Sequence, residues 1–395
     1  MIKDREQKRM AARFCAAQGL VPFLEVVVRS PASLDESPMN ITDIDVVGLE
    51  LSRAGTTSRT LFDCKTGGPK LTPINRALWA GGLKLLVGAE RAFVIQQRET
   101  PHSHKLAASR MGILLHTEKT FDLYAASLAA DYVSGATYLE NPETWDELFA
   151  MAGVGPLENL VSFSCTQAAL EKSGGRGLRH GLAAFLKAAP ELDPAKPRHR
   201  LLFGSGLSAY LVFLARAVGE LKDVLALPME REPFEKTLRY FIWEGRENYE
   251  IRRQMRAALE RARGVEDSSD LLPEWGRLIN LMRSLLDAPD ALSALPLLAK
   301  EMAFRLAQAP LPLADVRLQR MFRQNPRARQ FIFAVTAYLV NAAGLPKDFA
   351  SAVERDVNML LEAEAIEQPQ SGNPESSSSN EHTDSLLQLL GKGGA

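Results

Sequence analysis

The sequence predicts an α/β domain at residues 1–122, an all-helical domain at residues 123–365 and a disordered tail at residues 366–395. Three observations lead to this prediction. Helix-like and strand-like segments alternate in the first part, and strand-like segments are almost absent from the second. The third part is dominated by Ser, Gln, Asn, Pro and Gly, a composition that cannot bury a core.

The first 122 residues predict the element order α-β-β-β-α-β-α-β. Residues 4–18 carry apolar side chains at helical spacing, and Gly19 is the expected end of this helix. Runs of apolar and β-branched residues then predict strands at 21–28, 41–51 and 59–66. The remaining elements are a helix, a strand, a short helix and a strand, expected at 72–87, 91–96, 104–110 and 112–116.

The second part is rich in Ala, Leu, Arg and Glu, with apolar residues at helical spacing in runs such as 207–215 and 331–340. The Gly-rich run at 174–181 lacks the Gly-Lys-Ser/Thr ending of a phosphate-binding loop, and we interpret it as a connection between helices. No fixed-period repeat is evident.

The composition excludes several classes of protein. The three cysteines are far apart, which argues against a disulfide framework and against a Cys-based zinc site. No apolar run is long enough to span a membrane, and the charged N-terminus lacks the apolar core of a signal peptide, so we expect a cytoplasmic protein without membrane contact. The first 122 residues hold 17 Lys and Arg against 13 Asp and Glu, a balance of 17 − 13 = +4, which is compatible with a polyanionic partner.

Ionisable residues interrupt two of the apolar strands. On the strand at 41–51, alternation places Asp43 and Asp45 on one face, and on the strand at 59–66 it places Asp63 and Lys65 on one face. If these strands pair as a hairpin, the charged groups converge at one end of the sheet. Close carboxylates in a buried setting need a compensating cation.

A divalent metal is the natural compensator, since Mg²⁺ prefers carboxylate oxygens and retains water molecules. Asp45, Asp63 and the backbone carbonyl of Cys64 are the candidate ligands, with Mn²⁺ able to replace Mg²⁺. Lys65 would lie beside the metal, where it can orient or help deprotonate a water molecule and neutralise charge on a phosphate. The implied chemistry is hydrolysis of a phosphodiester.

This pattern, Asp-(apolar)₂-Gly on one strand and Asp-Xaa-Lys on the next, resembles the PD-(D/E)xK nuclease superfamily. The resemblance covers about the first 120 residues and implies a restriction-endonuclease-like αβββαβ core, with Asp45 and Asp63 as acidic ligands and Lys65 as the catalytic lysine. Ile44 replaces the proline of the superfamily's name. Some relatives carry a glutamate on the first helix; the matching position here is Lys8, so Glu6 is only a nearby candidate, and Asp43 is a further one. Other families place a polar residue on the helix after the lysine, where Asn75 or Arg76 falls.

A row of arginines in the helical part is a candidate nucleic-acid contact. Arg317, Arg320 and Arg323 recur every three residues, so a helix is expected to present them along one side. The alternative is a solvated face that forms ion pairs with neighbouring helices.

These features predict a Mg²⁺-dependent endonuclease that hydrolyses DNA, with restriction, anti-phage defence or repair as roles implied by the resemblance alone. The helical part would supply DNA contacts, a homodimer interface or a surface for a protein partner. The alternatives are RNA as the substrate, and a non-catalytic binding scaffold with a degenerate nuclease fold.

Overall fold

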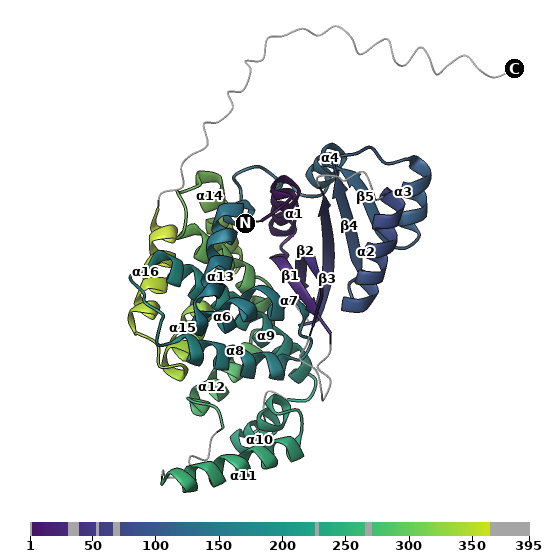
Figure 1. Ribbon diagram of the computed structural model, residues 1–395. Coiled ribbons are helices and arrows are strands. Elements are labelled where there is room, and N and C mark those ends of the chain that lie inside the picture. Colours follow the sequence, from purple (N-terminus) through teal and green to yellow (C-terminus); the bar gives the residue numbers. More distant parts are fainter. Residues whose placement is uncertain are drawn as a thin grey trace, which may run out of the picture. The chain divides into compact units, whose positions relative to one another are not determined.

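The computed structural model describes residues 2–30, 39–52, 55–65, 72–225, 229–264 and 271–363, except for the side chain of Arg263. Residues 1–363 form one compact unit. The predicted tail at 366–395 lies outside the described residues. The unit combines a mixed sheet with its own helices, followed by an all-helical region (Figure 1).

The sheet has five strands in the order β1-β2-β3-β4-β5. β1, β2 and β3 are antiparallel, whereas β4 and β5 run parallel to β3. The predicted order of elements is confirmed over this part. The bounds are α1 Arg5–Ala17, β1 Val21–Arg29, β2 Asn40–Leu51, β3 Thr57–Lys65, α2 Pro73–Val87, β4 Arg91–Gln96, α3 His102–Ser109, β5 Ile113–Thr117 and α4 Glu118–Leu128.

Local sequence signals explain where the two helices beside the site begin and end. α1 ends before Gly19, whose φ of 76° lies in the left-handed region that glycine adopts without strain. At the start of α2, the Thr72 side chain accepts a hydrogen bond from the backbone N–H of Asn75, and Pro73 occupies the first turn. Gly88, with φ 66°, ends that helix.

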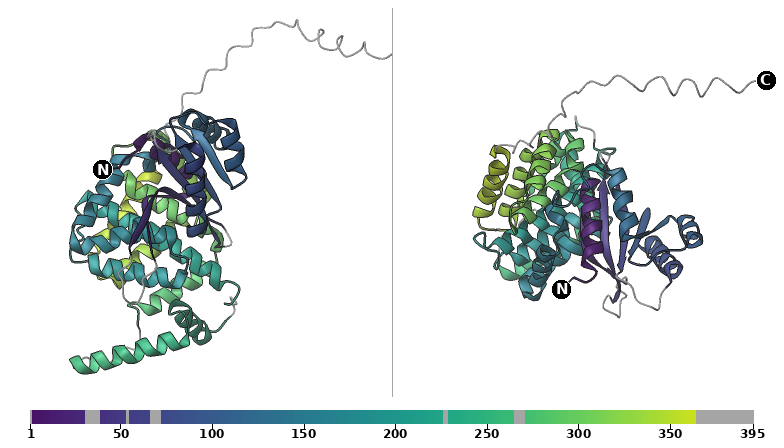
Figure 2. Two further views of the ribbon diagram at one scale, coloured as in Figure 1. Left: turned by 45° about the vertical axis from the view of Figure 1, so that its right-hand side comes forward. Right: turned by 90° about the horizontal axis from the view of Figure 1, so that it is seen from above.

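The two faces of the sheet are covered by different helices. α1 packs against β1, β2 and β3 on the side towards the helical region, and α2 packs against β4 and β5 on the other side (Figures 1 and 2). A ring cluster fills the α1 side: Phe62 and Phe93 stack with centroids 5.1 Å apart, and Phe14 meets Phe121 edge-on at 5.5 Å. This cluster fixes the position of β3 relative to α1.

From Glu118 to Glu362 the described residues contain helices and no strand, as predicted. The bounds are η1 Tyr138–Glu140, α5 Pro142–Ala150, η2 Met151–Gly153, α6 Gly155–Ser162, the π-helical turn η3 Phe163–Gln167, α7 Ala168–Leu170, α8 Gly174–Ala188, α9 Pro197–Leu221, α10 Arg231–Ile242, α11 Arg246–Arg263, α12 Trp275–Leu286, η4 Pro289–Ser293, α13 Leu295–Arg305, α14 Pro312–Gln324, α15 Ala328–Ala342 and α16 Asp348–Glu362.

Two features of this region differ from simple expectation. The Gly-rich run at 174–181 is not a connection, because it forms the first half of α8 and its small residues allow close packing; a Cβ on Gly177 would lie 1.9 Å from the Phe213 ring. α9 is long and apolar enough to cross a membrane, but its apolar window is entirely buried in the protein, as in a core helix.

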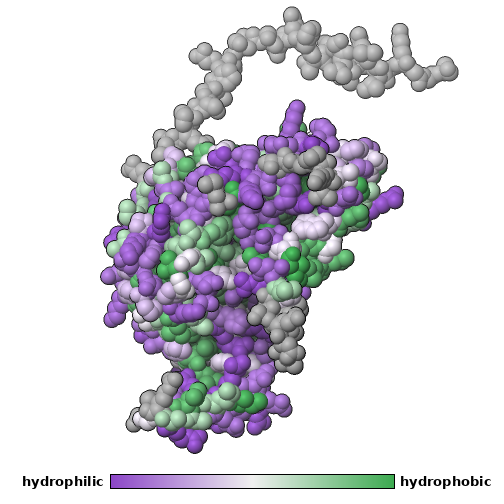
Figure 3. All heavy atoms as spheres, in the orientation of Figure 1, coloured by the Kyte–Doolittle hydropathy of each residue, from purple (hydrophilic) through white to green (hydrophobic). Residues whose placement is uncertain are grey.

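One helix carries an apolar stripe on its surface. Ile251, Met255 and Leu259 recur every four residues on α11 and are more than half exposed. Figure 3 shows apolar side chains gathered over this helix at the lower end of the view. Such a stripe is typical of a surface that contacts another molecule.

Candidate functional site

Three acidic residues form a row across the antiparallel strands. The pairing of Val46 with Phe62 places Asp45 opposite Asp63 at the next step of the β2–β3 ladder. In the β1–β2 ladder, Leu24 pairs with Val46 and Val26 with Ile44, so Glu25 stands opposite Asp45. Like charges at opposite positions repel one another, so this row requires nearby cations.

Three cations alternate with these acids. Lys65 Nζ lies 2.9 Å from Asp45 Oδ2 and 3.8 Å from Asp63 Oδ1. Lys8, which reaches the sheet from α1, has its Nζ 3.0 Å from Asp45 Oδ1 and also pairs with Glu25. The sheet thus holds a charge-compensated cluster rather than isolated carboxylates.

Arg76 on α2 is the third cation. Its Nε donates to Asp63 Oδ2 at 2.8 Å, and its Nη2 pairs with the other oxygen of the same carboxylate. This two-pronged contact covers Asp63, which is only 6% exposed. The Arg76 guanidinium also lies over the Trp79 ring, 4.9 Å from its centroid.

The backbone contributes to the same cluster. The amide of Cys64 donates to Asp45 Oδ2 at 2.8 Å, so each oxygen of Asp45 has a partner. The Cys64 side chain is fully buried, and burial raises the pKa of its thiol well above the usual value. The predicted contribution of this residue is its backbone carbonyl.

The two aspartates differ in their electrostatics. Burial raises the pKa of Asp63 and outweighs the opposing effect of Arg76 and Lys65. Burial also acts to raise the pKa of Asp45, but Lys65 and Lys8 outweigh it and leave this pKa below its usual value. Asp45 is therefore the more firmly ionised carboxylate.

The pKa values of the two lysines are both raised. Burial lowers the pKa of Lys65, but the attraction of Asp45 and Asp63 outweighs it and leaves the pKa above the usual value. The pKa of Lys8 is likewise raised by Asp45 and Glu25 against the effect of burial. Both ammonium groups are charged at neutral pH.

The backbone at Glu25 is strained. Its φ of 51° lies in the left-handed region, which a residue with a side chain rarely adopts inside a strand. The strain occurs at the position opposite Asp45, where the Glu25 carboxylate meets Lys8. Strained residues cluster at functional sites, so this observation supports a role for the cluster beyond stability.

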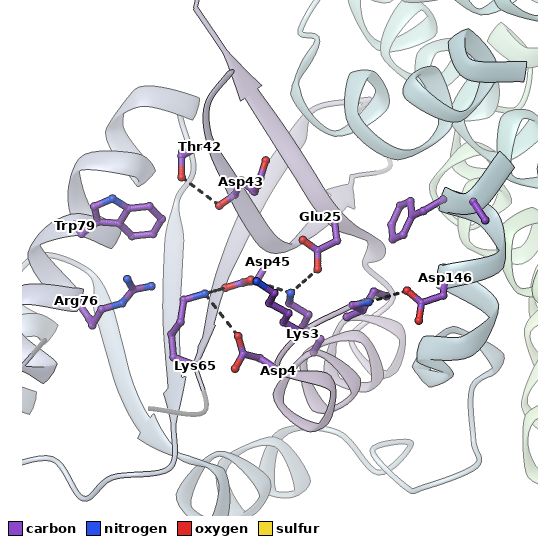
Figure 4. Close-up of a pocket in the computed structure, with 14 residues that line it drawn as sticks. Lys3, Asp4, Glu25, Thr42, Asp43, Asp45, Lys65, Arg76, Trp79 and Asp146 are labelled. Carbon is purple, nitrogen blue, oxygen red and sulfur yellow. Dashed lines mark hydrogen bonds and ion pairs between the residues drawn. The ribbon is translucent and has the colours of Figure 1, made fainter. Parts of the chain in front are cut away.

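Five of the six charged residues of the cluster, all except Asp63, line a cleft of about 940 Å³ between α2 and α5 (Figure 4). Trp79 and Arg76 form the α2 wall, and Asp146 and Phe149 form the α5 wall. Lys65 and Asp45 lie between these walls. The remaining lining residues are Ile2, Lys3, Asp4, Lys8, Glu25, Thr42, Asp43 and Ala150.

The two additional acidic candidates have different positions. Asp43 is exposed and lines the cleft, two residues before Asp45. Glu6 does not line it; its side chain is 57% exposed and lies 3.5 Å from Arg9 on the surface of α1. The first-helix residue that enters the site is instead Lys8, a cation at the place where an acid was sought. Glu25 and Arg76 also join the site, and Glu25 had no distinguishing signal in the sequence.

The predicted arginine ridge is wrong in one member. Arg317 is buried, and its guanidinium donates to Glu301 Oε1 and to the backbone carbonyl of Ala16, each at 2.6 Å. Arg320 is half-exposed and pairs with Asp131, and Arg323 is exposed. A helix has 3.6 residues per turn, so residues three apart do not stay on one face of it. Arg317 therefore lies between α1 and α13, whereas Arg323 is exposed.

The ligand atoms available at the site can be compared with those that the predicted metal prefers. Carboxylates of Asp45 and Asp63 with a backbone carbonyl are the oxygen donors that Mg²⁺ prefers. Among the described residues, no group of three or more acidic, His or Cys side chains is placed to hold a metal ion. The chemistry of the donors fits Mg²⁺ or Mn²⁺, but the contacts of Asp63 require Arg76 to move before that carboxylate can bind a metal.

Comparison with known proteins adds no relative from which a function could be transferred. No family model, no curated protein and no solved structure matches this chain.

Proposed function

We propose that this protein is a Mg²⁺-dependent nuclease that hydrolyses DNA phosphodiester bonds with Asp45, Asp63 and Lys65. One observation carries the proposal: Lys65 Nζ lies 2.9 Å from Asp45 and 3.8 Å from Asp63 beside an open cleft. Two acids and an amine from adjacent strands are the set that metal-assisted phosphodiester hydrolysis needs.

The order of elements gives further support. α1, three antiparallel strands, α2 and a parallel strand β4 follow one another along the chain. This order agrees with the αβββαβ core that the resemblance to PD-(D/E)xK nucleases implies. A restriction-endonuclease-like core is part of the proposal.

The side chains have distinct roles in this mechanism. Asp45, Asp63 and the Cys64 carbonyl would hold Mg²⁺, which supplies Lewis-acid activation of the scissile phosphate and of water. Lys65 Nζ lies near both carboxylates, and its side chain lines the cleft. We assign to Lys65 the orientation of the attacking water and the stabilisation of negative charge that develops on the phosphate.

The cleft walls favour a nucleic-acid substrate. Trp79 is 40% exposed on one wall and offers a ring on which an unpaired base can stack. Arg76, beside it, is suited to two-pronged contact with a phosphate. These contacts serve DNA and RNA alike, so the substrate is tested directly.

The experiment is a cleavage assay with Mg²⁺ or Mn²⁺ on single- and double-stranded DNA and RNA of one sequence. Lys65→Ala and Asp63→Asn are expected to lower the rate at least about a hundredfold, as removal of a transition-state charge partner does. Lys119→Met and Glu50→Gln, exposed residues away from the cleft, serve as matched controls. Equal cutting by wild type and both site variants would show that the site assignment is wrong.

The second candidate is a non-catalytic scaffold with a degenerate nuclease fold. The observation that favours it is the pairing of Asp45 and Asp63 with Lys8, Lys65 and Arg76, which compensates both acids without a metal. Calorimetric titration of wild type and Arg76→Gln with Mn²⁺ separates the candidates, because the scaffold binds no metal through Asp63 in either protein.

A further inference from the structure

The contacts of Arg76 bear on how the site is regulated. Its guanidinium grips both oxygens of Asp63, and its side chain also lines the cleft. Arg76 therefore stands between the buried carboxylate and any ligand that enters. Among the residues described, it is the cation through which the cleft and Asp63 are connected most directly.

The charge balance of the cluster determines which ions can enter beside Arg76. Lys8, Lys65 and Arg76 match Glu25, Asp45 and Asp63 one for one. A divalent ion that entered alone would give the cluster an excess of positive charge. The entry of a phosphate together with the ion reduces that excess.

Arginine binds carboxylate and phosphate with the same planar pair of N–H donors. If a phosphate in the cleft takes the guanidinium, Asp63 loses its main partner. That carboxylate is almost fully buried, and a buried negative charge without a partner is unfavourable. A metal ion would then be its natural new partner.

We propose that Arg76 is a substrate-operated latch: it blocks Asp63 in the free protein and releases it to a metal ion when it transfers to a phosphate of the nucleic acid. This inference rests on the proposed nuclease function and adds an order of binding. Metal and nucleic acid then strengthen each other's binding by the same factor, as linkage requires.

The test is a pair of binding measurements on Arg76→Gln. In a calorimetric titration of the protein without nucleic acid, Arg76→Gln is expected to bind Mn²⁺ at least about tenfold more tightly than wild type, because no guanidinium competes for Asp63. In EDTA, where no metal is free, the same variant is expected to bind a fluorescein-labelled 12-nucleotide single strand of DNA about tenfold more weakly. A residue that serves only to hold the fold together would not change the two affinities in opposite directions.

Controls keep the outcomes distinct. Arg91→Gln removes an exposed arginine at the opposite end of β4 and is expected to change neither affinity. Asp63→Asn combined with Arg76→Gln is expected to abolish the gain in Mn²⁺ binding. Arg76→Lys keeps a charge but cannot grip both oxygens, so it serves as a second variant if Arg76→Gln unfolds, with an intermediate Mn²⁺ affinity expected.

The results separate the latch from the nuclease. If wild type and the Arg76 variants bind Mn²⁺ equally and Asp63→Asn abolishes that binding, the latch is wrong and the metal site is right. If DNA binding does not change in Arg76→Gln, the exchange with phosphate is wrong. If none of the proteins binds Mn²⁺ through Asp63, both the latch and the proposed function are wrong.

Discussion

Lys8 Nζ lies 3.0 Å from Asp45 Oδ1, and the Lys8 side chain is only 3% exposed. A buried lysine thus reaches from the first helix to the middle strand of the candidate site. On the other oxygen, Lys65 lies 2.9 Å from the same carboxylate. Lys8 acts on the site through its ion pairs with Asp45 and Glu25, so we regard it as a positioning residue.

Lys8→Met is expected to destabilise the protein by about 3 kcal/mol, because removal of one partner leaves buried charge without compensation. The pKa of Asp45 is low because Lys65 and Lys8 together overcome burial, so it should rise in this variant. A carboxylate with a lowered folded-state pKa stabilises the fold above its unfolded pKa and loses that effect as the pH falls. Acid unfolding of Lys8→Met should therefore begin at a higher pH than that of wild type.

The measurement is urea unfolding at pH 7 together with acid titration of the circular dichroism signal. Arg9→Met, which removes a half-exposed arginine from the same helix, is the control, and its effect should stay within about 1 kcal/mol. Equal stability of Lys8→Met and Arg9→Met would contradict the role of Lys8.

The sheet and the core of the site could be predicted from the sequence for a simple reason. Strand alternation fixes which residues share a face, and the Asp45 and Asp63 strands are joined by a short connection. Their pairing then follows from local chemistry. The same reasoning located Lys65, which lies two residues beyond Asp63 on the same strand.

The cations from other elements could not be predicted in this way. Lys8 and Arg76 reach the acids from helices, and their direction depends on packing that alternation does not encode. Glu25 looked like an ordinary strand residue, because its left-handed backbone has no signature in a single sequence. The prediction of a connection at the Gly-rich start of α8 was wrong for a related reason, because glycine occurs at sites of close packing as well as in turns.

Lys300 provides a prediction about pH. Its ammonium group is fully buried, donates to the carbonyl of Pro22 at 2.9 Å and lies 3.8 Å from the Phe23 ring centroid. Burial lowers the pKa of Lys300 from 10.5 to about 7. Between these values the unfolded chain holds a proton that the folded protein lacks, so stability rises with pH across this window.

Lys300→Met removes this penalty. Its gain in unfolding free energy over wild type should be greatest below pH 7, on the order of a few kcal/mol before the lost contacts are subtracted. The gain should then shrink as the pH rises towards 10.5. Urea unfolding from pH 6 to 10 measures it, with the exposed Lys187→Met as control. A difference between Lys300→Met and wild type that does not vary with pH would contradict the buried charge.

Arg317 should prove structural. It is the charged partner of Glu301, which is fully buried and also accepts from Thr137 Oγ1 at 2.6 Å. Arg317→Ala leaves that carboxylate without its cation and is expected to cost about 3–5 kcal/mol. The exposed Arg323→Ala should cost less than about 0.5 kcal/mol.

Urea unfolding of both variants checks this difference, and anisotropy with labelled DNA checks the rejected role. DNA affinity of folded Arg317→Ala should equal that of wild type. If Arg317→Ala had unchanged stability but bound DNA more weakly, Arg317 would be a nucleic-acid contact after all.

The close packing of α1 on β2 explains why the strand pattern has a glycine at position 48, three residues after Asp45. A Cβ at this position would lie 2.7 Å from Cys15 Sγ on α1 and 3.0 Å from Leu20 Cδ1. The missing side chain lets α1 approach β2, and α1 carries Lys8 to Asp45. Gly48→Ala is therefore expected to cost about 1–3 kcal/mol through overpacking. It should also lower the cleavage rate, because it pushes Lys8 and Asp45 apart.

Gly82→Ala is the matched control: nothing lies within 4 Å of its Cβ, and within helix α2 the added methyl should stabilise by up to about 1 kcal/mol. Thermal unfolding and the cleavage assay measure both effects, and a Gly48→Ala protein as stable as wild type would mean that this close approach does not hold α1 in place.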